Sequence, residues 1–212
     1  MEVDLCFVMD CTGSMACHID AAKNCILNVA KYMEDMKPSI KIRVGFCGYR
    51  DYCDGADRLL IFPFTDSCMN LENDLSTVLA KGGGDIPEDV LGGLDAAVNQ
   101  MTWQNKIRVL FHVGDAPPHG RRFTSMTEDY PEGDPNHLTA ENVLEKMQSE
   151  NIFYFFGKIN NLTEKMVNIF HSIIGDFSVF DLEIVEGNPE ALISKFFEAT
   201  CSAINTAVSL RE

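Results

Sequence analysis

The chain has 212 residues, of which 46% are hydrophobic, and its 32 acidic and 17 basic residues give a net charge of −15. This charge disfavours a nucleic-acid backbone or an anionic membrane as partner, although an acidic surface also simply serves solubility. No apolar run approaches the roughly 20 residues of a membrane span, and no basic and apolar leader precedes the first predicted strand. Because no repeat or linker divides the chain, we expect one soluble domain over residues 1–212.

The chain begins with a buried strand that leads into a loop of oxygen-bearing side chains. Residues 5–9 are all apolar, which is typical of a strand covered on both faces. The run stops at Asp10, and from residue 19 to residue 36 apolar side chains recur at helical spacing. Between strand and helix, Asp10, Thr12 and Ser14 occupy alternate positions. Such residues often cap helices, but one carboxylate and two hydroxyls are also ligands suited to Mg²⁺, Mn²⁺ or Ca²⁺.

The rest of the chain alternates between strands and helices. We expect strands at 40–49, 58–64, 106–113, 151–157 and 177–181, and helices at 70–80, 87–101, 138–149, 163–173 and 189–208. A hairpin turn at residues 50–55 should make the strand that follows it antiparallel. This order predicts a doubly wound α/β fold, with a mostly parallel central sheet, one antiparallel edge strand and helices on both faces.

Two later loops add acidic residues near the first one. Asp115 follows the strand at 106–113, and if the first and fourth strands are neighbours its carboxylate meets that of Asp10 at the point where the winding reverses. A glycine run, Gly82–Gly84, precedes Asp85. This run lacks the Lys-Ser/Thr ending of a P-loop, so it is a weak indication of phosphate binding.

The constellation resembles the metal-ion-dependent adhesion site (MIDAS) of von Willebrand factor type A (VWA) domains, which have a Rossmann-like fold. Asp10, Thr12 and Ser14 match the family's Asp-x-Ser-x-Ser pattern, and Asp115 matches the Asp of its third loop. In the second loop Asp85 stands where relatives often carry Thr, so a carboxylate either replaces that hydroxyl or points away. The strings Gly-Tyr-Arg-Asp and Gly-Gly-Gly-Asp-x-Pro-Glu-Asp are similar to those of A domains attached to atypical α-kinases and of hemicentin-like matrix proteins.

The resemblance implies a protein-binding module that is not an enzyme. In the family the hydroxyls ligate Mg²⁺ directly and the carboxylates mostly act through water, so an acidic side chain of a partner protein fills the open position. Mn²⁺ or Ca²⁺ are alternative ions. Other interpretations stay open: a hydrolase in which Asp10 or Asp115 activates a metal-bound water, or a regulatory or targeting domain of an α-kinase with a vestigial site. Because the loops offer no convincing general acid or nucleophile–base pair, binding is preferred.

Several other polar residues receive a structural interpretation. His112 lies inside an apolar strand and is predicted to be a hydrogen-bonded core histidine, and His119 receives no catalytic role. Asp51 and Asp54 are expected to shape the hairpin turn in preference to binding a second metal. Residues 128–134 are predicted to form a solvated loop that could shape the rim of the site.

The eight cysteines are interpreted as free thiols. They form no pair of CxxC motifs that would suggest zinc, and several fall on predicted core strands and helices. Free thiols are typical of a reducing compartment, so a cytoplasmic location is expected, or an extracellular one if the chain is a fragment of a secreted protein.

Overall fold

A computed structural model describes residues 1–186 and 188–211 of the chain. Its centre is a six-stranded sheet with the order β3-β2-β1-β4-β5-β6. The strands are β1 (Glu2–Asp10), β2 (Lys41–Tyr49), β3 (Leu59–Thr65), β4 (Ile107–Gly114), β5 (Ile152–Lys158) and β6 (Val179–Asp181). β3 pairs with β2 antiparallel and the other neighbouring pairs are parallel, which confirms the predicted sheet with one antiparallel edge strand.

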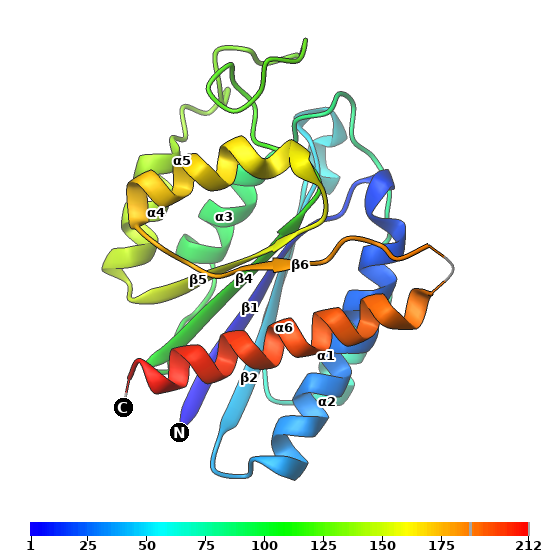
Figure 1. Ribbon diagram of the computed structural model, residues 1–212, viewed down its shortest axis with the longest axis vertical. Helices are drawn as coiled ribbons and strands as arrows, with labels where there is room; N and C mark the ends of the chain where they lie inside the picture. Colours follow the sequence, from blue (N-terminus) through cyan, green and yellow to red (C-terminus); the bar gives the residue numbers. More distant parts are fainter. Residues whose placement is uncertain (187, 212) are drawn as a thin grey trace.

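Helices cover both faces of the sheet, also as predicted (Figure 1). One layer holds α1 (Ala16–Met36), α2 (Cys68–Ser76) and α6 (Pro189–Ser209), and the other holds α3 (Val90–Asn99), α4 (Ala140–Ser149) and α5 (Glu164–Ile174). Among the described residues, no helix is long and apolar enough to cross a membrane. The chain winds outward from β1 through β2 on one side and from β4 through β5 on the other, so the winding reverses between β1 and β4. Asp10 is the last residue of β1, and Asp115 directly follows β4.

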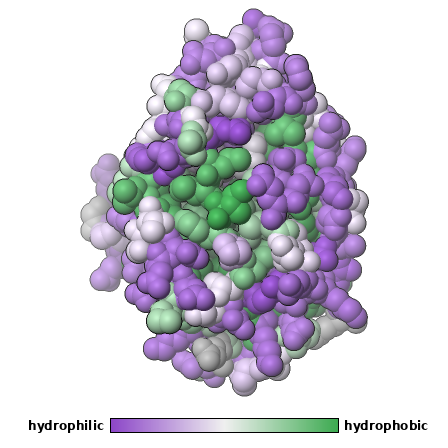
Figure 2. Space-filling view, turned by 180° about the vertical axis from the view of Figure 1, so that it is seen from behind, coloured by the Kyte–Doolittle hydropathy of each residue, from purple (hydrophilic) through white to green (hydrophobic). Residues whose placement is uncertain are grey.

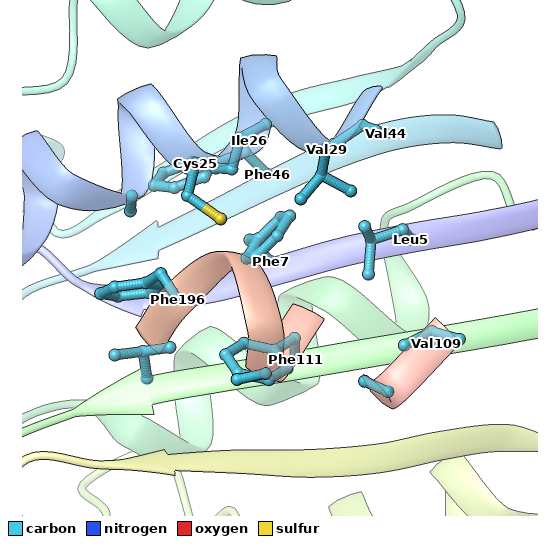
Figure 3. Packing of buried hydrophobic residues seen from close by; sticks show 14 of the residues in the cluster. Leu5, Phe7, Cys25, Ile26, Val29, Val44, Phe46, Val109, Phe111 and Phe196 are labelled. Atoms are coloured by element: carbon cyan, nitrogen blue, oxygen red, sulfur yellow. The ribbon is translucent and has the colours of Figure 1, made fainter. Parts of the chain in front are cut away.

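The central strand β1 is held by side chains of both layers. Leu5 and Phe7 contribute to the layer of α1 and α6, whereas Cys6 and Val8 contribute to the layer of α3, α4 and α5. Figure 3 shows Phe7 between α1 and Phe111 of β4, and the two rings pack edge to face with centroids 5.8 Å apart. Burying a side chain of this size stabilises the fold by roughly 1.5–3 kcal/mol. This packing fixes the end of β1, and with it the position of the first loop.

His112 of β4 is a hydrogen-bonded core residue, as predicted. The ring is fully buried, its Nε2 lies 2.9 Å from the hydroxyl of Tyr49, and its Nδ1 lies 2.7 Å from the hydroxyl of Tyr154. Burial lowers the pKa of His112 to about 3. The ring is therefore neutral at physiological pH, with one nitrogen donating to a tyrosine and the other accepting.

The helix after the glycine run begins later than predicted. We expected Pro87 and the two acidic residues after it to form its first turn, but α3 begins at Val90. Asp89 is the N-cap, and its carboxylate accepts a hydrogen bond from the amide of Gly92 at 2.9 Å. Glu88 lies outside the helix, because it forms an isolated β-bridge with Pro118 beyond the end of β4.

All eight cysteines are free in the structure, as expected. Cys6, Cys11, Cys25 and Cys47 are buried, and Cys17, Cys53 and Cys68 are exposed. Burial raises the pKa of both Cys11 and Cys25 to about 12, so these two remain protonated in the folded protein. They act as small core residues and not as reactive thiolates.

Candidate metal centre

Three loops meet beyond the carboxyl ends of β1 and β4, in the upper part of Figure 1. They are the β1 loop (residues 10–15), the glycine loop (81–89) and the β4 loop (114–120). The amide of Gly13 donates to the carbonyl of Gly82 at 3.3 Å, which joins the first two loops. The amide of Glu88 donates to the carbonyl of Pro117 at 3.0 Å, which joins the glycine loop to the β4 loop. Residues far apart in the sequence are thereby held at one edge of the sheet.

Asp10 is the buried acidic residue at the centre of these loops. Its side chain is fully buried, and Oδ1 accepts hydrogen bonds from the amide and the hydroxyl of Thr12 at 2.9 and 2.6 Å. Its other oxygen, Oδ2, has no hydrogen-bond partner among the described residues. Burial, together with the charge of nearby Asp115, raises the pKa of Asp10 to about 8. An unpaired carboxylate oxygen is costly inside a protein, and a bound cation would remove that cost.

Two hydroxyl groups stand beside this carboxylate. Thr12 is 2% exposed, and its Oγ1 lies 3.4 Å from Oγ of Ser14, which is exposed. Oxygen ligands at right angles around Mg²⁺ are about 3 Å apart, given metal–oxygen distances of about 2.1 Å. The two hydroxyls are therefore close enough together to bind one ion.

Glu88 is a buried carboxylate that the sequence pattern did not indicate. It is 5% exposed, and its Oε2 makes no hydrogen bond within the described ranges. Burial, followed by the charge of Asp10, raises the pKa of Glu88 to about 10. Its Oε1 approaches the β1 loop beside Gly83, where a Cβ atom would lie 2.9 Å from that oxygen and 3.3 Å from Cβ of Thr12. Gly83 has a φ of +87°, so glycine is favoured there on both counts.

The structure brings four of the five predicted ligands together and places the fifth in a different group. Asp10, Thr12 and Ser14 lie in one turn, and Asp115 is close enough to Asp10 to shift its pKa. Asp85 groups instead with Asp51 and His119, and one ligand atom of each lies within 4.8 Å of the others. Glu88 thus supplies a carboxylate of the glycine loop beside Thr12, and the charge of Asp10 contributes to its raised pKa.

His119 is held between two carboxylates. Its Nε2 lies 2.8 Å from Oδ1 of Asp51, and its Nδ1 lies 2.8 Å from Oε2 of Glu128. Burial alone would lower the pKa of His119, but hydrogen bonds to these two carboxylates raise it. The prediction of a solvated loop at residues 128–134 is therefore wrong for Glu128, whose side chain is 1% exposed.

Arg50 is a buried cation that ties the surrounding loops together. Its side chain is almost fully buried, and its guanidinium group donates to the carbonyls of Cys11, Asp57 and Leu79 at 3.2, 2.5 and 2.8 Å. These carbonyls belong to the β1 loop, to the loop between β2 and β3, and to the segment that enters the glycine loop. One side chain therefore positions the backbone on three sides of the site.

We expect Arg50→Ala to lower the free energy of unfolding by about 3 kcal/mol, because three carbonyl groups lose their donor in a largely buried environment. Urea denaturation measures this change. Arg121→Ala is the control, because that side chain is 68% exposed, and it should change stability by less than about 0.5 kcal/mol. Equal losses in the two variants would show that Arg50 does not organise the loops.

The fold and these loops define the class of the protein. The sequence pattern of the von Willebrand factor A domain family matches residues 4–132, a segment that includes the β1, glycine and β4 loops. The chain therefore belongs to the von Willebrand factor A domain family, as the residues of its β1 loop predicted.

Two curated proteins are similar to this chain. The alpha-protein kinase vwkA of Dictyostelium discoideum is 38% identical over 170 residues, which cover 79% of this chain and 27% of that protein. The putative ariadne-like RING finger protein R811 of Acanthamoeba polyphaga mimivirus is 29% identical over 121 residues, which cover 55% of this chain and 11% of that protein. The matched region is thus a minor part of either relative.

Solved structures show the same fold. Proximal thread matrix protein 1 from the mussel byssus aligns with a TM-score of 0.61 at 14% identity, covering 93% of this chain and 46% of that one. The von Willebrand factor type A protein from Catenulispora acidiphila aligns with a TM-score of 0.59 at 16% identity, covering 96% of this chain and 42% of that one. At these identities the likeness concerns the fold alone.

Proposed function

We propose that this chain is a metal-ion-dependent protein-binding module, in which Mg²⁺ or Mn²⁺ beyond the ends of β1 and β4 binds an acidic side chain of a partner. VWA domains are generally protein-interaction modules and often depend on a divalent metal. The observation that carries the proposal is the pair of buried carboxylate oxygens, Oδ2 of Asp10 and Oε2 of Glu88, that lack hydrogen-bond partners in the described part of the chain. A cation beside the hydroxyls of Thr12 and Ser14 would satisfy both.

The charges of the site suit an acidic partner group. Thr12 and Ser14 are neutral ligands, so the charge of the ion stays exposed toward the open position. A partner carboxylate that arrives there makes a charge-assisted contact with the ion. The loop end of the molecule is largely hydrophilic in Figure 2, so recognition there would depend on polar contacts and the metal more than on apolar burial.

Binding of a partner should therefore require both the metal and Ser14. We expect Ser14→Ala to weaken binding at least tenfold, because the ion loses a hydroxyl ligand. Ser125→Ala, at an exposed serine near the β4 loop, is the matched control and should bind as the wild type does. A pull-down in Mg²⁺ and in EDTA identifies partners, and changing their Asp and Glu residues to Ala locates the anchor. Partners that bind equally in EDTA, or equally to Ser14→Ala, would contradict the proposal.

We also propose that residues 1–212 act as one non-catalytic domain in the cytoplasm. Membership in the VWA family supports a binding role, and the free thiols suit a reducing compartment. The similarity to the alpha-protein kinase vwkA supports a regulatory or targeting role within a longer polypeptide. In such a protein the domain would bring a partner to an activity located elsewhere in the chain.

A further inference from the structure

A second group of potential ligands lies beside the candidate metal centre and takes no part in the function proposed above. It consists of Asp51, Asp85 and His119, whose ligand atoms lie within 4.8 Å of one another. The side chains of Asp51 and His119 are 1% and 2% exposed. The three residues come from the β2–β3 loop, the glycine loop and the β4 loop, so the fold, and no local turn, brings them together.

Glu128 orients His119 in the manner of a metal ligand. Oε2 of Glu128 lies 2.8 Å from Nδ1 of the ring, and Oε1 accepts a hydrogen bond from the amide of Gly120 at 2.7 Å. Because Glu128 is fixed in this way and accepts the proton on Nδ1, the Nε2 atom is directed toward Asp51. Histidines that bind metals commonly donate their other nitrogen to a carboxylate, which fixes the ring and its tautomer.

Asp85 supplies an oxygen that nothing else in the described structure satisfies. Its Oδ2 accepts a hydrogen bond from the amide of Asp129 at 2.7 Å, whereas its Oδ1 is buried without a partner among residues 1–186 and 188–211. A proton on Nε2 of His119 satisfies Asp51 but leaves Oδ1 of Asp85 unpaired. A divalent cation would bind Asp51, Asp85 and His119 together. It would offset two of the three negative charges of Asp51, Asp85 and Glu128, whereas a proton on Nε2 offsets one.

We propose that Asp51, Asp85 and His119 form a second metal site, separate from the one at Asp10, that binds a borderline transition ion such as Zn²⁺. The imidazole nitrogen favours Zn²⁺ over Mg²⁺, which prefers oxygen ligands alone. This assignment departs from the sequence-based expectation for Asp51. Asp54, by contrast, shapes the turn as expected, because its carboxylate accepts a hydrogen bond from the amide of Asp51 at 3.0 Å.

The test uses Zn²⁺ itself, on a background in which the exposed Cys17, Cys53 and Cys68 are changed to Ser so that surface thiols do not bind the ion. Isothermal titration in excess Mg²⁺ should show one Zn²⁺ bound per chain. Asp85→Asn preserves the shape of a partly exposed side chain and should weaken Zn²⁺ binding at least tenfold, as should His119→Gln. Ser14→Ala, which affects the site at Asp10, should leave Zn²⁺ binding unchanged.

Two results would overturn the second site. One is unchanged Zn²⁺ affinity in both Asp85→Asn and His119→Gln, and the other is loss of Zn²⁺ binding in Ser14→Ala. Nitrogen-15 spectra of the histidine rings give a readout that does not depend on the folding of a variant. Zn²⁺ should shift the Nε2 resonance of His119 in the background protein to that of a metal-bound nitrogen. A ring that stays doubly protonated in saturating Zn²⁺ would show that His119 only bridges Asp51 and Glu128.

Discussion

Glu88→Gln should stabilise the metal-free protein and at the same time remove most of its response to Mg²⁺. Glu88 is buried, one of its oxygens has no partner in the described structure, and its pKa is raised to about 10 by burial and by the charge of Asp10. Without a cation, folding at pH 8 requires Glu88 to take up a proton, which an amide in its place does not require, so we expect a gain of about 1 kcal/mol or more in the free energy of unfolding. The same change removes a group that favours the ion.

Calorimetry in EDTA and in excess Mg²⁺ measures both effects. An ion that binds only the native state stabilises it by about 2.7 kcal/mol when its concentration is a hundred times its dissociation constant. The wild type should therefore have a higher melting temperature in Mg²⁺ than in EDTA. In EDTA, Glu88→Gln should have a higher melting temperature than the wild type, and Mg²⁺ should raise that temperature only slightly. Glu72→Gln, at an exposed position of α2, is the control and should behave as the wild type does. A variant that is less stable in EDTA yet gains as much from Mg²⁺ would contradict this account.

The stability of the metal-free protein should fall as the pH rises from about 5 to about 8. The pKa of Asp10 rises from 3.8 to about 8, first through burial and then through the charge of Asp115. The pKa of Glu88 is raised in the same direction, and so is that of His119. The folded state therefore binds more protons than the unfolded state across this window, and a group of this kind loses its contribution to stability as the pH rises through its folded pKa.

Mg²⁺ should reverse or flatten this slope, because the ion competes with protons for the same carboxylates and binds more tightly as they ionise. Urea denaturation at several pH values, with EDTA and with Mg²⁺, gives the two curves. They should diverge as the pH rises. Parallel curves would mean that no proton is exchanged for the ion at this site.

The fold was predictable because its signals are local and repeated. The apolar run at residues 5–9 marks a strand buried on both faces, and the spacing of apolar residues in α1 marks a helix against it. The alternation of such elements leaves few topologies. The start of α3 was misplaced because Glu88 and Asp89 follow Pro87 as acidic residues do in a first helical turn, whereas Glu88 bonds to the β4 loop instead.

The site was predictable where it depends on strand ends and on the residue pattern of the β1 loop. Asp10 and Asp115 meet because β1 and β4 are parallel neighbours, which the element order indicates. The parts played by Glu88 and Glu128 depend on contacts between loops, such as the approach of Glu88 past Gly83 and the bond from Glu128 to His119. Contacts between loops leave no periodic pattern in the sequence. An acidic residue in a loop is usually solvated, so neither residue was expected to be buried.

A crystal grown in Mn²⁺ tests most directly whether a cation binds beside Asp10. Data collected near the manganese absorption edge should give an anomalous peak within bonding distance of the hydroxyl oxygens of Thr12 and Ser14, close to Asp10, Glu88 and Asp115. We expect the hydroxyl of Thr12 to turn from Oδ1 of Asp10 toward the ion. Well-ordered loops with no peak there in saturating Mn²⁺, and with Thr12 still bonded to Asp10, would contradict the proposed function.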